Sequence, residues 1–182
     1  MGTWVWVVIA AAAVVGAAFV AWATLRAWRT RRLQAGFGPE YDHVVAEAPT
    51  RREAEAELRE RQERHRELDL RSLSSETRNR YVDRWRDVQA RFVDDPGESI
   101  ADADLMIQAV MRELGYPVDE FEQRAADISV DHPEVVSNYR AAHGISIAHE
   151  RGSATTDDLR QALIHYRALF NELLETAATP AG

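Results

Sequence analysis

Residues 3–25 read TWVWVVIAAAAVVGAAFVAWATL, a stretch without a single ionisable side chain. At a helical rise of about 1.5 Å per residue it extends for roughly 34 Å, enough to cross the hydrocarbon core of a bilayer. Tryptophan rings favour the headgroup layer, and four of them mark the two ends of the stretch: Trp4, Trp6, Trp22 and Trp28. The stretch therefore predicts an N-terminal transmembrane helix.

A cleaved secretory signal is the alternative interpretation of this stretch. Ala21-Trp22-Ala23 offers a small-residue cleavage site. However, the basic segment that normally precedes a signal's apolar region is missing, and the apolar run exceeds the usual length of about 7–15 residues. An anchor is favoured, and a secreted helical domain stays open as the alternative.

Arginines lie on one side of the predicted span only. Arg26, Arg29, Arg31 and Arg32 follow it, and no basic side chain precedes it. The positive-inside rule then predicts a single-pass protein of the cell membrane, with its N-terminus outside and its C-terminal domain in the cytoplasm.

Small residues recur every four positions within the span, at Ala13, Ala17 and Ala21. Such a face lets two membrane helices approach closely. Weak self-association of the membrane helix is therefore compatible with the sequence, although alanine is abundant here in any case.

The charge of the rest of the chain argues against some partners, and the residue types that the chain lacks exclude several kinds of chemistry. Residues 33–182 carry 18 of the 22 arginines against all 30 acidic residues, a net charge of −12. Such a segment is not attracted to nucleic acid by bulk electrostatics. The chain has no Cys and no Lys, which excludes thiol nucleophiles, zinc–thiolate sites, Schiff bases and the lysine of a P-loop.

A hinge and a charged arm are predicted to follow the span. Gly36, Gly38 and Pro39 break the helix within a juxtamembrane segment at 26–49, because glycine relaxes the backbone and proline disfavours helix before it. A charged helical arm follows at 50–70, beginning with a Thr50–Glu53 capping box. Its acid-first i,i+4 pairs are Glu55–Arg59, Glu57–Arg61 and Glu60–Arg64. Such a helix is either a solvated arm or one side of a contact with a partner, and the charge run favours the solvated arm.

Residues 71–175 are predicted to form a small helical bundle, followed by a flexible tail at 176–182. Apolar side chains recur at helical spacing in each segment, and capping residues delimit the helices. The predicted N-terminal signals are Ser74 or Ser75, Ser99, the Asp131–Glu134 capping box, and Thr155 or Thr156, and the predicted terminators include Gly115 and Gly152. The fold class is therefore all-α.

No catalytic motif is recognisable, and no cofactor is predicted. The GxSxA stretch around Ser146 lies in a helical context rather than at a strand-to-helix turn, and His149-Glu150 lacks the second histidine of a zinc-protease motif. The weak candidates for a metal site are Asp127, Asp131, His132 and His143. Their spacing matches no diagnostic ligand pattern, and Asp131 is better explained as a cap.

Three stretches carry a resemblance: Gly36-Phe37-Gly38-Pro39-Glu40-Tyr41-Asp42, Ser129-Val130-Asp131-His132-Pro133, and Asp158-Leu159-Arg160-Gln161-Ala162 with His165-Tyr166-Arg167. Together they resemble a group of uncharacterised single-span membrane proteins of high-GC, actinobacterial-type bacteria, which have a Gly-Pro-Glu-Tyr-Asp hinge after the membrane helix. The resemblance implies a bacterial plasma membrane and a shared helical domain. It implies no activity and no functional residues.

These features favour a non-enzymatic, membrane-tethered module that binds a protein partner or acts as a scaffold. The alternative is a ligand- or metal-binding, enzyme-like helical domain with its pocket between the helices. The sequence leaves the identity of the partner open.

Overall fold

The computed structural model describes residues 2–176, without the side chains of Thr3 and of residues 5–13. Over the described range the chain is all-α, as predicted, with seven helices and no strand. They are α1 (Thr3–Glu47), α2 (Arg51–Arg66), α3 (Ser75–Arg91), α4 (Pro96–Leu114), α5 (Phe121–Asp131), α6 (Val136–Glu150) and α7 (Thr156–Thr176). The predicted tail beyond Thr176 lies outside the described residues.

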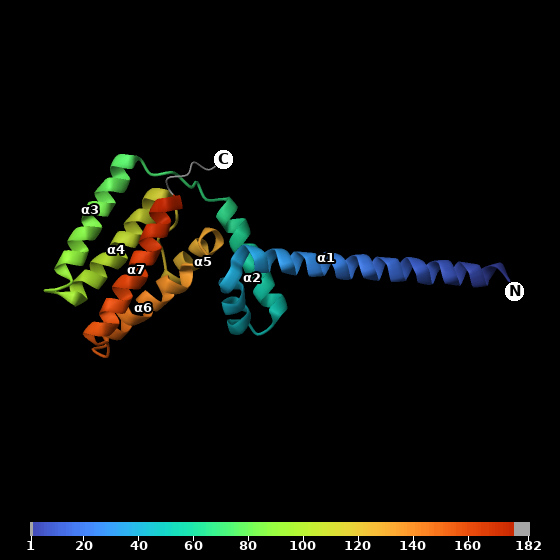
Figure 1. Ribbon diagram of the computed structural model, residues 1–182. Coiled ribbons are helices and arrows are strands. Elements are labelled where there is room, and N and C mark those ends of the chain that lie inside the picture. The colour runs from blue at the N-terminus through green and yellow to red at the C-terminus, as the bar shows by residue number, and fades with distance from the viewer. Residues whose placement is uncertain (1, 177–182) are drawn as a thin grey trace.

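Helix α1 projects from a helical body as a long rod (Figure 1). The body consists of α3, α4, α6 and α7 side by side, and α5 and α2 lie between this bundle and the rod. Among the residues whose side chains are described, no helix is long and apolar enough to cross a membrane. Most of the first half of the predicted span, Thr3 and residues 5–13, falls outside that description.

The bundle core is formed by the apolar faces that the sequence predicts. Trp85 of α3 stacks on Phe170 of α7, with ring centroids 4.7 Å apart. Tyr139 of α6 meets the edge of Tyr166 of α7. From α4 the buried side chains include Ile100, Ala103, Ile107, Val110 and Leu114. One shared core therefore joins α3, α4, α6 and α7.

A second, smaller core lies where the rod meets the body, and we call it the junction core. Its buried members are Leu33, Phe37, Tyr41 and Val44 from α1 and Ala54 and Leu58 from α2. Phe37 is only 1% exposed. Burying a side chain of this size contributes about 1.5–3 kcal/mol, so the junction core stabilises the contact between α1 and α2.

The helix break predicted at residues 36–39 is present as a bend at Gly38. Gly38 has φ 45° and ψ −126°, a conformation that favours glycine, and Pro39 begins the next helical turns with a φ already suited to them. The side chains on either side, Phe37 and Glu40, are buried. The bend is therefore a packed corner between residues 3–37 and residues 39–47, and not the freely moving hinge that the sequence suggested.

The expectation of a solvated arm also needs correction. Helix α2 starts as predicted at Thr50, whose hydroxyl accepts a hydrogen bond from the Glu53 N–H at 3.2 Å, but it ends at Arg66 rather than near residue 70. It packs against α1 and α5. The buried side chains of α2 are the apolar Ala54 and Leu58 together with the charged Glu55 and Arg61.

Two predicted caps are wrong. Helix α4 starts before Ser99, because Pro96 occupies its first position and Asp95 accepts the capping hydrogen bond from the Glu98 N–H at 3.1 Å. Ser99 is buried one turn inside. Asp131 does not begin α6: it is the last residue of α5, and α6 starts only at Val136.

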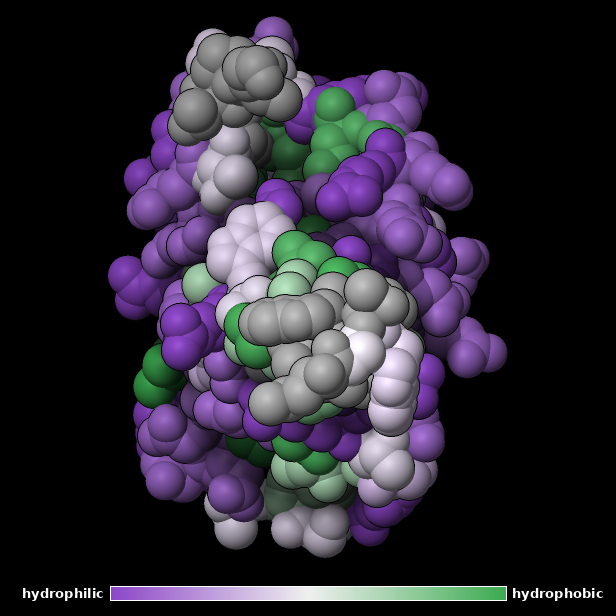
Figure 2. All heavy atoms as spheres, turned by 90° about the vertical axis from the view of Figure 1, so that its right-hand side faces the viewer, coloured by the Kyte–Doolittle hydropathy of each residue, from purple (hydrophilic) through white to green (hydrophobic). Residues whose placement is uncertain are grey.

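Figure 2 looks along α1 at the face of the body from which the rod projects. The described atoms that surround the rod on this face are mostly hydrophilic.

Candidate functional site

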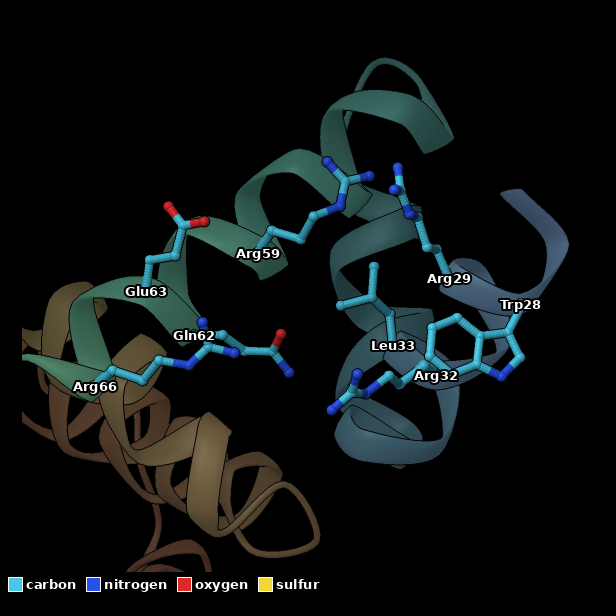
Figure 3. Close-up of a pocket in the computed structure, with 8 residues that line it drawn as sticks. All are labelled: Trp28, Arg29, Arg32, Leu33, Arg59, Gln62, Glu63 and Arg66. Atoms are coloured by element: carbon cyan, nitrogen blue, oxygen red, sulfur yellow. The ribbon is translucent and has the colours of Figure 1, made fainter. Parts of the chain in front are cut away.

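A pocket of about 300 Å³ opens between the base of the rod and α2 (Figure 3). Trp28, Arg29, Arg32 and Leu33 of α1 and Arg59, Gln62, Glu63 and Arg66 of α2 line it. In Figure 3 the guanidinium groups of Arg29 and Arg59 approach each other, while Arg32 and Arg66 reach in from opposite walls.

Helical spacing explains why these residues share one pocket. The four α2 residues have the spacing i, i+3, i+4 and i+7, which places them on one face of that helix. On α1 the pair Trp28-Arg29 lies one turn before the pair Arg32-Leu33, so these four residues also share a face. The junction core, which includes Leu33 of α1 and Leu58 of α2, holds the two faces opposite each other. The basic flank of the predicted span thus forms half of a pocket whose other half comes from the charged arm.

The pocket is strongly basic, with four arginines and one acidic residue in its lining. Arg59 lies 3.6 Å from Glu55, while the guanidinium of Arg32 lies over the Trp28 ring, 5.6 Å from its centroid. Arginine only donates hydrogen bonds and keeps its charge at any physiological pH. The arrangement is therefore suited to holding an anionic group.

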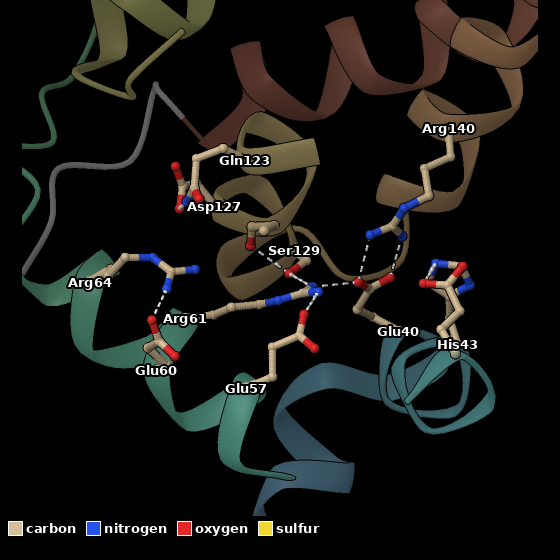
Figure 4. A network of polar contacts seen from close by, with 12 residues as sticks. Glu40, His43, Glu57, Glu60, Arg61, Arg64, Gln123, Asp127, Ser129 and Arg140 are labelled. Carbon is tan, nitrogen blue, oxygen red and sulfur yellow. Dashed lines mark hydrogen bonds and ion pairs between the residues drawn. The ribbon is translucent and has the colours of Figure 1, made fainter. Parts of the chain in front are cut away.

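A buried ion network ties the rod to the body (Figure 4). The Glu40 carboxylate, whose side chain is 1% exposed, accepts hydrogen bonds from Arg61 at 2.7 Å and from Arg140 at 2.6 and 2.8 Å. Arg61 also donates to the Ser129 hydroxyl at 3.2 Å and pairs with Glu57. This network, which we call the Glu40 clamp, joins α1, α2, α5 and α6 next to the junction core.

A second polar cluster connects the end of α2 to the end of α5. The Asp131 carboxylate lies 2.6 Å from His65 Nε2 and accepts a hydrogen bond from the Tyr116 hydroxyl at 2.6 Å. Burial raises the pKa of Asp131, but the hydrogen bonds from His65 and Tyr116 outweigh it and hold that pKa below its usual range. Burial also raises the pKa of the Tyr116 phenol. All three groups are occupied with one another, which indicates a structural role.

The four weak metal candidates have separate partners. Asp127 accepts a hydrogen bond from Gln123 at 2.8 Å, and burial raises the pKa of its carboxyl group. His132 lies 3.2 Å from Glu172, while His143 stacks on Phe121 with centroids 3.6 Å apart, and burial lowers the pKa of His143. Asp131 belongs to the cluster above. Over the described residues, no group of three or more His, Asp or Glu side chains is arranged to hold a metal ion.

The predicted topology residues lie along the rod. Trp4, Trp22 and Trp28 are exposed, and the Trp6 side chain lies outside the described residues. Arg26, Arg29, Arg31 and Arg32 are exposed as well, with the Arg26 guanidinium 5.7 Å from the centroid of the Trp22 ring. Sequence reasoning missed Arg59 and Arg66 as partners of this flank, although their i,i+7 spacing on α2 was a usable signal.

Comparison of the chain with protein-family models, with curated proteins and with solved structures found no match.

Proposed function

We propose that this chain is a non-enzymatic, single-pass membrane protein that holds an acidic helical body at a fixed position beneath the cytoplasmic face of the cell membrane. The observation that carries the proposal is the continuity of α1. One helix includes the uncharged stretch of residues 3–25, the basic flank, and the Leu33 and Phe37 side chains buried in the junction core. An anchor built in this way is part of the fold of the body rather than a linker attached to it.

The direction of the chain across the membrane follows from its basic flank. Four arginines lie within seven residues of Leu25 and none precedes it, which favours a cytoplasmic body. The resemblance to single-span bacterial proteins supports a bacterial plasma membrane. The hydrophilic face around the rod in Figure 2 suits contact with headgroups and water rather than insertion into the hydrocarbon layer.

The partner that the body suits best is a protein with a basic face. Residues 94–134 contain twelve acidic residues and two arginines, so this segment, which includes α4 and α5, accounts for most of the negative charge of the body. Asp119, Glu120 and Glu122 are exposed side by side before and in the first turn of α5. An acidic surface attracts basic partners and speeds their association.

An introduced cysteine tests this surface directly, because the chain has no Cys of its own. A thiol-reactive crosslinker therefore attaches only at the introduced position. We expect Asp119→Cys, carrying a thiol-attached photo-crosslinker in native membranes, to give a discrete adduct that weakens strongly at about 0.5 M salt, where the Debye length falls to a few ångströms. Asp83→Cys, at an exposed position on α3, is the matched control and should give no such adduct. Equal labelling from both positions, or none from Asp119→Cys, contradicts the proposal.

A further inference from the structure

The basic pocket lies at a particular depth relative to the predicted span. Arg29 and Arg32 follow Leu25 by four and seven residues, so they lie roughly 6 and 10 Å further along the helix axis. A headgroup layer extends about 5–8 Å beyond each side of the hydrocarbon core. If the chain is anchored as proposed above, Arg29 lies within the headgroup layer of the inner leaflet and Arg32 lies just past its outer edge, so the pocket is within side-chain reach of the lipid phosphates.

The pocket lacks enough negative charge of its own. Within the described part of the chain, the carboxylate that lies within 4.0 Å of Arg59 belongs to Glu55, and Arg29, Arg32 and Arg66 have none within that distance. Four guanidinium groups around one small space repel each other unless an anion lies between them. Because the junction core and the Glu40 clamp fix both helices, this repulsion is not relieved by moving them apart.

The geometry suits a phosphate group in particular. The planar fork of arginine matches the oxygen atoms of phosphate, and several forks can bind one tetrahedral group from different sides. The Gln62 amide lies between the arginines in Figure 3 and offers an uncharged donor. Trp28 is exposed at the outer wall, where an indole ring favours the region between headgroups and acyl chains. Nucleic acid is a poor alternative, because the adjoining body carries a net charge of −12.

We propose that the pocket formed by Arg29, Arg32, Arg59 and Arg66 binds the phosphate of an anionic phospholipid headgroup from the inner leaflet. That the pocket binds a phosphate group follows from its arginines alone. That this phosphate belongs to a membrane lipid rests on the proposed membrane anchoring. Its consequence is that an acidic body, which an anionic leaflet would otherwise repel, is held against that leaflet at one site.

The test is a lipid titration of the full-length chain in neutral detergent, followed by native mass spectrometry. The probes are phosphatidylglycerol, phosphatidylcholine and inorganic phosphate, each added alone. We expect phosphatidylglycerol to bind about tenfold or more tightly than phosphatidylcholine, since the latter's own cation competes for the phosphate. Inorganic phosphate binding as tightly as phosphatidylglycerol would overturn the lipid assignment.

Two double variants with the same change in charge show whether the pocket is responsible. Arg32→Gln with Arg66→Gln removes one pocket arginine from each helix and should weaken phosphatidylglycerol binding by about tenfold or more, because charge-assisted hydrogen bonds are lost. Arg31→Gln with Arg52→Gln changes exposed arginines on the same two helices outside the pocket and should change binding less than about twofold. Equal losses from the two variants, or no loss from the pocket variant, overturn the inference.

The detergent format separates this inference from the proposed function. The pocket is accessible in detergent however the chain lies in the cell, so a failed titration rejects the pocket as a lipid site and leaves the anchoring untouched. Circular dichroism of each variant confirms that the helices are intact. If the pocket variant has lost helicity, the single change Arg66→Gln replaces it, because Arg66 is exposed near the end of α2. This change should also weaken phosphatidylglycerol binding, and unchanged binding would overturn the inference.

Discussion

Replacing Glu40 with glutamine is expected to destabilise the folded chain by about 3–5 kcal/mol, the usual cost of removing one partner from a buried ion pair. Arg61, with a side chain 8% exposed, would keep its charge and lose its buried counter-ion, and Arg140 would lose a bidentate partner. Glutamine has nearly the shape of glutamate, so the loss reports the charge rather than a cavity. Urea unfolding of the full-length chain in neutral detergent, followed by circular dichroism, measures the effect.

The matched control for Glu40 is Glu60→Gln. Glu60 also pairs with an arginine, Arg64 at 2.8 Å, but its side chain is 68% exposed. We expect that change to cost less than about 0.5 kcal/mol. A double-mutant cycle of Glu40→Gln with Arg140→Gln should show strong coupling, whereas equal effects of Glu40→Gln and Glu60→Gln would mean that the Glu40 clamp does not hold the rod to the body.

Gly115→Ala is expected to be the second large effect, with a loss of about 2–5 kcal/mol from backbone strain together with a clash. Gly115 ends α4 with φ 93°, and a Cβ atom added there would lie 2.3 Å from the Asp69 carbonyl oxygen. That oxygen belongs to the backbone of the segment between α2 and α3, which also bonds to α4 through the Arg71 N–H and the Leu114 carbonyl at 2.9 Å. Relief of the clash therefore requires the linker to move away from the bundle.

The same substitution at Gly144 should have the opposite sign. Gly144 lies inside α6, where an added Cβ atom meets nothing within 4 Å. Alanine is the better helix former by about 0.8–1 kcal/mol, so Gly144→Ala should stabilise the chain by roughly that amount. Thermal unfolding of both variants in one buffer makes the comparison, and a stable Gly115→Ala protein would contradict the described packing of the linker.

Local signals predicted the helices well because they depend on neighbouring residues. Thr50 and Ser74 cap their helices as expected, and Gly115 and Gly152 end theirs with positive φ. The three predicted i,i+4 pairs of α2 are also present. The cap predicted at Ser99 failed because a stronger signal, Asp95 followed by Pro96, lies four residues earlier.

Contacts between distant segments were not predictable in the same way. The Glu40–Arg140 pair joins residues 100 positions apart, and nothing local distinguishes Glu40 from the other acids of the chain. The junction core was not predicted for a different reason. Its α1 members follow helical spacing, but the glycines and the proline between them indicated a flexible linker; these members are Leu33, Phe37, Tyr41 and Val44. The pocket was not predictable for both of these reasons. Its two halves come from separate helices, and the arginines of one half were already explained as a topology signal.

The proposed anchoring places residues 3–25 across the membrane and the body in the cytoplasm. The most direct measurement labels single cysteines in intact bacterial cells with a membrane-impermeant maleimide, comparing Gly2→Cys with Val93→Cys, the latter at a side chain 83% exposed on the body. The native chain contains no Cys and provides the background. We predict that Gly2→Cys is labelled in intact cells and that Val93→Cys is labelled only after permeabilisation. Labelling of Val93→Cys in intact cells, or labelling of neither position there, would contradict the proposed anchoring.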